Sequence, residues 1–269
     1  MPLRRVRHTA LVALTLILLC AATGLAYARW SDVSCSPLAA ERCVRVLFLG
    51  NSYTFTNDLP AVFRRLGRSG GRNIEVSVVA LPGETLAQHA ASSDSLGAIR
   101  GGGAQIVILQ EQSQIPADPA ARTSEMFPAA RELVAAIDRA GARPILLETW
   151  AHRDGWPDRG LDFKGMQDEI DRAYRQLEVE LPAEVAPAGE AWRSLVGPDP
   201  FAAGAAAIAG ALWLPDGSHP TIAGTYLAAC VLYAAAFHAS PAGLTDIEGL
   251  DPDLARTIQT AAATSAALP

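Results

Sequence analysis

The chain has 269 residues, of which half are apolar and 19% are charged, so it can form the core of one α/β domain or at most two small ones. Its formal net charge is −6. With no lysine- or arginine-rich block in its globular part, this charge argues against nucleic acid as a partner.

The first 28 residues have the pattern of a secretory signal peptide. Arginines precede an apolar stretch over residues 10–22, and Ala26-Tyr27-Ala28 resembles a small-residue cleavage site. The apolar stretch is short for a membrane span. We therefore expect a secreted or otherwise extracytoplasmic protein, which contacts a membrane only if this segment stays uncleaved as an anchor.

The cysteines predict a disulfide, since an exported protein enters an oxidising compartment, and they do not predict a metal site. Cys35 and Cys43 lie close together in residues 29–43, interpreted as an N-terminal loop, and are expected to form a local disulfide. Cys230 lies in an apolar helical stretch and is expected to be a buried thiol. The sequence has no Cys-x-x-Cys, no His-Glu-x-x-His and no glycine-rich nucleotide signature, so we expect no cofactor and no metal.

From residue 44 to residue 269, apolar runs alternate with helical patterns, which indicates β-α-β units and a mostly parallel sheet. Strands are expected at Val44–Leu49, Ile74–Ala80, Gln105–Leu109, Pro144–Thr149 and, shorter, Glu184–Ala186. Helices are expected from Ser52 or Leu59 to about Arg68, at Thr85–Ile99, Thr123–Ala140, Phe163–Leu181 and Thr221–His238, and from about Pro252. Residues 201–212 are expected to be helix or loop.

Ser52 directly follows the first expected strand, in Gly50-Asn51-Ser52. Ligands of open α/β sheets gather at the carboxyl ends of the strands, and a helix starting here would point backbone N–H groups at a developing oxyanion. Taken alone, Ser52 also fits the role of a helix N-cap.

Asp216 and His219 supply what a nucleophilic serine lacks. A carboxylate three residues before an imidazole can accept a hydrogen bond from Nδ1 and leave Nε2 free as a general base. The alternative is a capped turn with a chance histidine. The combination with Ser52 favours a hydrolase, because serine needs a base and the base needs an orienting carboxylate.

Gly50-Asn51-Ser52 and Asp216-x-x-His219 make the chain resemble the SGNH/GDSL hydrolases, over about Val44 to Phe237. The resemblance implies a three-layer α/β/α sandwich with a mostly parallel, roughly five-stranded sheet. It implies oxyanion donors from the backbone of Ser52, the backbone of Gly83 and a side-chain amide. The chain departs from the family's Gly-x-Asn-Asp block, and Gln112 stands where the family has the asparagine.

Three ring side chains flank the expected site: Trp150 and His152 after the fourth strand, and Trp213 shortly before Asp216. They are candidates for an aromatic rim around a sugar ring or acyl group, the alternative being that they are packing residues. His89 and His238 lie in helical segments and are expected to be surface or packing residues.

These observations predict a secreted serine esterase for short acyl esters, with acetyl groups on extracellular carbohydrates as the suggested substrate. Ser52 would be the nucleophile, His219 the base and Asp216 its orienting acid. Two alternatives stay open: a binding protein that has lost activity, suggested by the altered third block, and an O-acyltransferase.

Overall fold

The computed structural model describes residues 31–32 and 43–267 of the chain. The expected signal peptide and Cys35 lie outside these residues. Cys43 takes part in a disulfide, and Cys230 is a buried free thiol, as expected. In the described part of the chain, no helix has the length and apolarity needed to cross a bilayer.

The centre of the fold is a six-stranded sheet in the order β1-β3-β2-β4-β5-β6. Its strands are β1 (Ser31–Asp32), β2 (Cys43–Gly50), β3 (Asn73–Ala80), β4 (Ile106–Gln110), β5 (Arg143–Glu148) and β6 (Glu184–Pro187). Strands β2 to β6 pair in parallel, which confirms the five expected strands. The short antiparallel edge strand β1 was not predicted, because its two residues lie in the segment interpreted as a loop.

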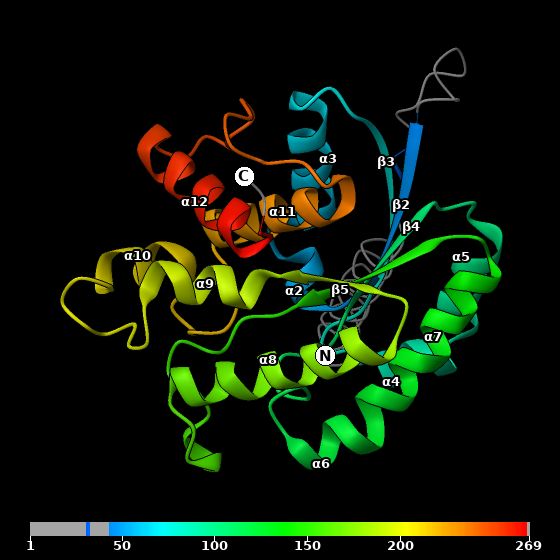
Figure 1. Ribbon diagram of the computed structural model, residues 1–269, viewed down its shortest axis with the longest axis horizontal. Coiled ribbons are helices and arrows are strands. Elements are labelled where there is room, and N and C mark those ends of the chain that lie inside the picture. The colour runs from blue at the N-terminus through cyan, green and yellow to red at the C-terminus, as the bar shows by residue number, and fades with distance from the viewer. Residues whose placement is uncertain (1–30, 33–42, 268–269) are drawn as a thin grey trace, which may run out of the picture.

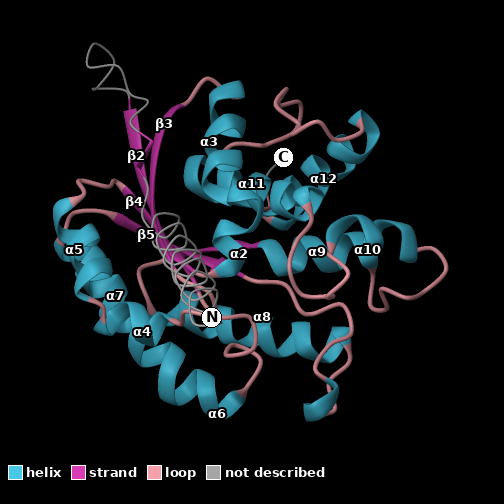
Figure 2. Cartoon of the chain, turned by 180° about the vertical axis from the view of Figure 1, so that it is seen from behind, coloured by secondary structure: helices cyan, strands magenta, loops and turns pink. Residues whose placement is uncertain are grey.

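Helices cover both faces of the sheet, which confirms the three-layer architecture (Figure 1). Helices α3, α9, α11 and α12 pack together on one side, and α4, α5 and α7 pack together on the other, where α8 also contacts β5 (Figure 2). The helical segments are α2 (Ser52–Phe55), η2 (Thr56–Asp58), α3 (Leu59–Ser69), α4 (Leu86–Ala91), α5 (Ser93–Gly101), α6 (Pro119–Ala121), η3 (Arg122–Met126), α7 (Phe127–Arg139), η4 (Pro157–Arg159), α8 (Phe163–Glu180), α9 (Ala188–Val196), α10 (Ala206–Leu212), α11 (Ile222–Phe237) and α12 (Pro252–Ser265).

The strand order places a crossover at the middle of the sheet. From β2 the chain passes to β3 on one side and then returns to β4 on the other, so the carboxyl ends of β2 and β4 flank a topological switch point. Strand β4 and most of β2 are buried on both faces, which explains their uninterrupted apolar runs. Loops leaving this edge are therefore held by a rigid support.

Two expected helices differ in detail from the structure. The helix expected at Thr85–Ile99 is two helices, because Ser92 adopts an extended conformation and its side chain caps α5. The helix expected from Thr123 begins earlier, at Pro119, and contains a π-helical turn before α7. Pro128 has no N–H to donate to the preceding turn, and the wider turn accommodates this loss.

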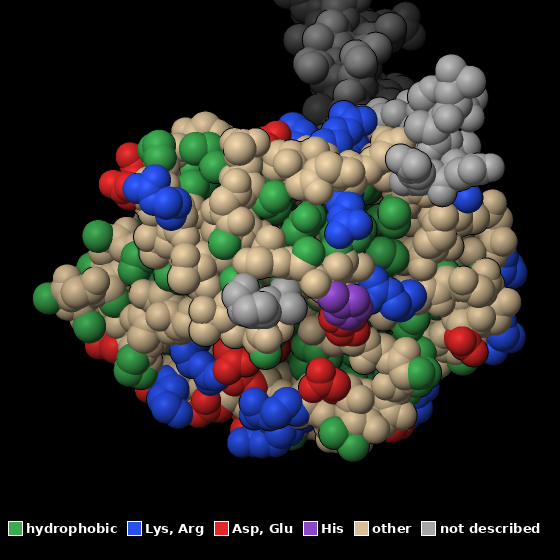
Figure 3. Space-filling model, turned by 45° about the horizontal axis from the view of Figure 1, so that its top comes forward, with side chains coloured by type: hydrophobic (Ala, Val, Ile, Leu, Met, Phe, Trp, Pro, Cys, Tyr) green, Lys and Arg blue, Asp and Glu red, His purple; other side chains and the backbone are tan. Residues whose placement is uncertain are grey.

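The surface in Figure 3 carries basic and acidic side chains in small groups, with acidic groups beside several of the basic ones. No continuous basic stripe crosses this face.

Candidate active site

Ser52 is the first residue of α2 and lies directly beyond the end of β2. The residue that caps α2 is Asn51, whose Oδ1 accepts a hydrogen bond from the Tyr53 backbone N–H at 3.1 Å. The alternative role of Ser52 as the N-cap is therefore wrong. Its hydroxyl is left for another partner.

That partner is His219, which comes from the opposite end of the sequence. Ser52 Oγ lies 2.9 Å from His219 Nε2, and His219 Nδ1 lies 2.8 Å from Asp216 Oδ2. Because an ionised carboxylate can only accept, Nδ1 carries the proton and Nε2 is the acceptor for the serine hydroxyl. The structure thus brings the three residues together in the expected order.

The turn between Asp216 and His219 fixes this geometry. Asp216 Oδ1 accepts the backbone N–H groups of Ser218 and His219, at 2.9 and 3.0 Å. Partial burial acts to raise the pKa of Asp216, but the hydrogen bonds from Ser218 and His219 outweigh it and hold the pKa below its usual value. The carboxylate therefore stays ionised at neutral pH, and the exposure of half of its side chain to water favours the same state.

Contacts on both sides of the turn hold His219 against the end of β2. The Leu214 backbone N–H donates to the His219 carbonyl at 2.8 Å. Beyond the histidine, Asn57 Nδ2 donates to the Pro220 carbonyl at 2.9 Å. Asn57 follows α2, so the segment carrying the serine also binds the segment carrying the histidine.

The tryptophans do not form a rim around the site. Trp150 is fully buried and stacks between Tyr53, at a ring-centroid distance of 4.6 Å, and Trp192 of α9, at 4.0 Å. Trp213 is 2% exposed and packs edge-on against Phe163 and Trp192. The rim interpretation is therefore wrong, and both rings belong to the core beneath the turn of His219.

Gln110, at the end of β4, connects β4 to the nucleophile turn. Its side chain is fully buried, and its Oε1 accepts from the Asn51 backbone N–H and from Thr54 Oγ1, both at 2.9 Å. Its Nε2 donates to Asn51 Oδ1 at 3.0 Å. A Cβ at Gly50 would come within 2.6 Å of Gln110 Oε1, so this network requires glycine at the end of β2.

Asn51 also connects the nucleophile turn to the loop that carries Gly83. Asn51 Nδ2 donates to the Glu84 carbonyl at 2.8 Å. Gly83 is exposed and has a φ of +69°, in the left-handed region that favours glycine. The loops after β2, β3 and β4 are thus held together by the two side-chain amides of Asn51 and Gln110.

Glu111 positions Gln112 and the start of α4. Its Oε1 accepts the backbone N–H groups of Gln112, at 2.6 Å, and Leu86, at 3.1 Å. Burial raises the pKa of Glu111 to about 7. Gln112 Oε1 accepts the backbone N–H groups of Gln114, at 2.8 Å, and Ile115, at 3.2 Å, which fixes the orientation of this amide.

His89 is a buried residue, which confirms the packing alternative, and it also supports the end of β2 through hydrogen bonds. It is fully buried, with Nε2 2.9 Å from the Gly50 carbonyl and Nδ1 2.8 Å from Ser95 Oγ. A carbonyl can only accept, so Nε2 carries the proton. Desolvation lowers the pKa of His89 to about 4, although the bond to Gly50 raises it in part. The ring is neutral at neutral pH, and Glu84 Oε2 lies 3.5 Å from the same nitrogen.

Because the pKa of His89 is lowered, the protein is expected to become less stable as the pH falls. Between about pH 6.5 and pH 4 the unfolded chain binds a proton at this histidine and the folded protein does not. The contribution of His89 to the free energy of unfolding is therefore complete above about pH 6.5. It decreases as the pH falls, by up to about 3 kcal/mol. In urea unfolding between pH 7 and pH 5, we expect wild type to lose more stability than His89→Gln. Equal losses would contradict this assignment. The raised pKa of Glu111 acts in the opposite direction in both proteins, so the comparison cancels it.

Ser113 was not predicted to belong to the site, whereas His152 was expected beside Trp150 as a candidate rim residue. Ser113 Oγ, after β4, lies 2.9 Å from His152 Nε2, after β5. Asn51 and Gln110 were likewise not assigned a role in the sequence. The available signal was that all four lie just at or beyond the carboxyl ends of β2, β4 and β5.

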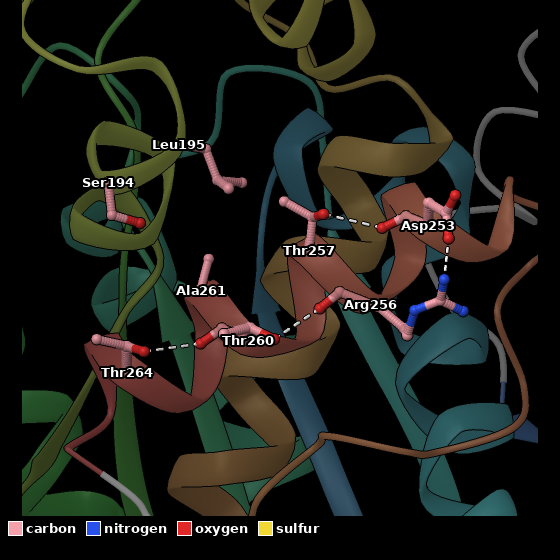
Figure 4. A pocket seen from close by; sticks show the side chains of 8 residues that line it. All are labelled: Ser194, Leu195, Asp253, Arg256, Thr257, Thr260, Ala261 and Thr264. Carbon is pink, nitrogen blue, oxygen red and sulfur yellow. Dashed lines mark hydrogen bonds and ion pairs between the residues drawn. The ribbon is translucent and has the colours of Figure 1, made fainter.

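A separate hollow of about 580 Å³ between α9 and α12 offers no comparable chemistry (Figure 4). The hydroxyls of Thr257, Thr260 and Thr264 each donate to the carbonyl four residues earlier. Ser194 Oγ donates to the Ala191 carbonyl at 2.7 Å. No histidine lines this hollow, so its serine has no base.

Comparison with models of known families, and with curated proteins, finds no match for the chain. Solved structures do match. A protein from Slackia heliotrinireducens, described as a candidate SGNH hydrolase, is 26% identical with a TM-score of 0.59, over 72% of this chain and 99% of that one. A DUF4886 family protein from Bacteroides uniformis is 18% identical with a TM-score of 0.67, over 83% and 94%.

An acetylxylan esterase from Geobacillus stearothermophilus is 15% identical with a TM-score of 0.51, over 72% of this chain and 93% of that one. At this identity the likeness shows the fold alone. The fold, its match to the Slackia protein, and the placement of the Gly-x-Ser and Asp-x-x-His blocks at one sheet edge agree: the chain belongs to the SGNH/GDSL hydrolase superfamily.

Proposed function

We propose that this protein is a secreted serine esterase that removes short acyl groups, acetyl above all, from esters of carbohydrates. The observation that carries the proposal is the unbroken path of hydrogen bonds from Ser52 Oγ through His219 to Asp216, at 2.9 and 2.8 Å. The pattern of the first 28 residues supports export, and an exported esterase would meet carbohydrate esters outside the cell.

In this mechanism, Ser52 Oγ forms a bond to the ester carbonyl carbon while its proton passes to His219 Nε2. The oxygen that becomes negative accepts hydrogen bonds from the backbone N–H groups of Ser52 and Gly83 and from the Gln112 amide. The C–O bond to the alcohol then breaks, and His219 gives its proton to the leaving oxygen. Water repeats the sequence on the acyl-enzyme and releases the acid.

Asp216 keeps His219 in the tautomer that this sequence requires, and it stabilises the imidazolium that forms. Its side chain is 50% exposed and that of His219 is 34% exposed, so the relay faces an open surface. An open site suits an ester of a bulky alcohol better than it suits a small ester that the protein would have to enclose.

A fluorophosphonate probe tests the nucleophile directly, because it forms a stable bond only with an activated serine. We expect one adduct per chain, located at Ser52 by peptide mass spectrometry, and loss of p-nitrophenyl acetate hydrolysis in proportion to labelling. Ser194→Ala is the matched control, since Ser194 is exposed, has no histidine partner and is expected to leave labelling unchanged. An unlabelled Ser52 in folded protein would overturn the proposal and favour a role in binding.

A further inference from the structure

Two polar side chains that the proposed mechanism does not use lie near the hydrogen-bonded set of Ser52, His219 and Asp216, which we call the relay. Ser113 is 7% exposed and His152 is partly exposed. The 2.9 Å contact between Ser113 Oγ and His152 Nε2 joins the loops after β4 and β5, which are neighbouring parallel strands. Both side chains therefore lie at the edge of the sheet that carries Ser52.

The segment that carries His152 runs along the turn that carries His219. The Arg153 backbone N–H donates to the Gly217 carbonyl at 2.7 Å, inside the turn between Asp216 and His219. The charges of His219 and Asp216 both influence the titration of His152, which agrees with a position close to the relay.

Ser113 connects this pair to the segment that carries Ser52. Its hydroxyl interacts with that of Tyr53, the residue after Ser52, and Tyr53 Oη lies 2.7 Å from Ser218 Oγ. The ring of Tyr53 also contacts that of His219 edge-on, with centroids 5.6 Å apart. The pair is thus linked through Tyr53 to the two segments that carry Ser52 and His219.

One ring nitrogen of His152 is available for a hydrogen bond to a ligand. Desolvation foremost, and then the charge of His219, lowers the pKa of His152, so the ring is neutral at neutral pH. A neutral imidazole has one donor and one acceptor nitrogen, and Nε2 is engaged with Ser113. Within residues 43–267, Nδ1 has no hydrogen-bond partner and is not sealed from solvent. A ligand hydroxyl, which can donate or accept, suits either tautomer.

We propose that Ser113 and His152 form a subsite for the alcohol part of the ester, in which His152 Nδ1 hydrogen-bonds a hydroxyl near the scissile oxygen. This inference rests on the proposed function, because His219 must reach the leaving oxygen and the alcohol therefore lies on its side of Ser52. The substrate class is an ester of a polyol with free neighbouring hydroxyls, such as a partly acetylated sugar.

The test compares two esters with the same acyl group and ring: a monoacetylated methyl glucoside, and the same compound with its free hydroxyls methylated. For wild type, we expect kcat/KM to favour the hydroxyl-bearing ester by about tenfold, the size of one uncharged hydrogen bond. In His152→Ala this ratio is expected to fall to about one, whatever happens to the absolute rates. Ser113→Ala is expected to reduce it in part.

His238→Ala is the matched control, because His238 is exposed at the end of α11 and should leave the ratio unchanged. A residue that only supports the fold would lower both rates and preserve the ratio. That outcome in His152→Ala would overturn the subsite, as would an absence of preference in wild type.

A binding measurement separates this inference from the proposed function. Wild-type protein that hydrolyses neither ester would refute the esterase, but methyl glucoside can still be titrated into Ser52→Ala protein by calorimetry. We expect its affinity to fall about tenfold when His152→Ala is added. Unchanged affinity, or no binding in either protein, would overturn the subsite.

Discussion

Ser52→Ala is expected to lower the turnover of p-nitrophenyl acetate by at least about a thousandfold, without loss of folding. Ser52 Oγ is the hydroxyl that lies 2.9 Å from the base, and alanine removes the atom that would bond to the carbonyl carbon. The donors of the oxyanion site and the substrate contacts remain, so residual activity and ligand affinity should persist. The measurement is kcat from initial rates, with thermal unfolding followed by circular dichroism.

Asp216→Asn provides a graded comparison in the same assay. Asparagine can still accept the backbone N–H groups of Ser218 and His219, so the turn is retained. It cannot supply the negative charge, and half of this side chain is solvated, so we expect a smaller loss of about a hundredfold.

Full activity in Ser52→Ala would place the nucleophile elsewhere. Equal ligand affinity in all three proteins, with no turnover in wild type, would favour the inactive binding protein.

Gln110→Leu is expected to reduce the free energy of unfolding by about 3 kcal/mol. Leucine has a similar volume but leaves the Asn51 backbone N–H and the Thr54 hydroxyl without their acceptor in the protein interior. Each buried group that loses its partner costs about 1–3 kcal/mol. Because Asn51 caps the helix of Ser52, hydrolysis is expected to fall as well. Urea unfolding at neutral pH measures the first effect.

Gln176→Leu is the control for this change, since Gln176 is exposed on α8 and the same substitution there should alter stability by less than about 0.5 kcal/mol. A Gln110→Leu protein as stable as the control would show that solvent reaches the end of β4 and satisfies the groups that Gln110 now binds.

The five parallel strands could be predicted from the sequence by two patterns. Strands β4 and β5 are buried and consist mainly of apolar residues, whereas β3 alternates between buried apolar and partly exposed residues. The arrangement of Ser52, His219 and Asp216 could also be predicted, because the combination of the two blocks is specific although each alone is weak. The N-cap alternative for Ser52 needed the structure, because Asn51 and Ser52 are both good caps and only the backbone shows which one precedes the helix.

The rim prediction for Trp150 was wrong because of a residue elsewhere in the chain. Sequence position places Trp150 at the edge of the sheet but does not give the direction of its side chain. That direction depends on Trp192 of α9, whose ring stacks against the indole of Trp150. Helix α9 was not predicted, since it is short and follows Pro187 directly. The contact between Ser113 and His152 was missed for a related reason, because loop-to-loop pairing leaves no periodic pattern.

The stacked aromatic cluster gives this site a spectroscopic signal of its own. Trp150 and Trp192 lie nearly parallel, at 10°, with centroids 4.0 Å apart, so their electronic transitions couple and contribute to near-ultraviolet dichroism. Tyr53, stacked on the other face of Trp150, contacts the imidazole of His219 edge-on. A change in the charge of that imidazole therefore alters the electric field at the indoles, and intrinsic fluorescence can follow events at the serine without an added dye.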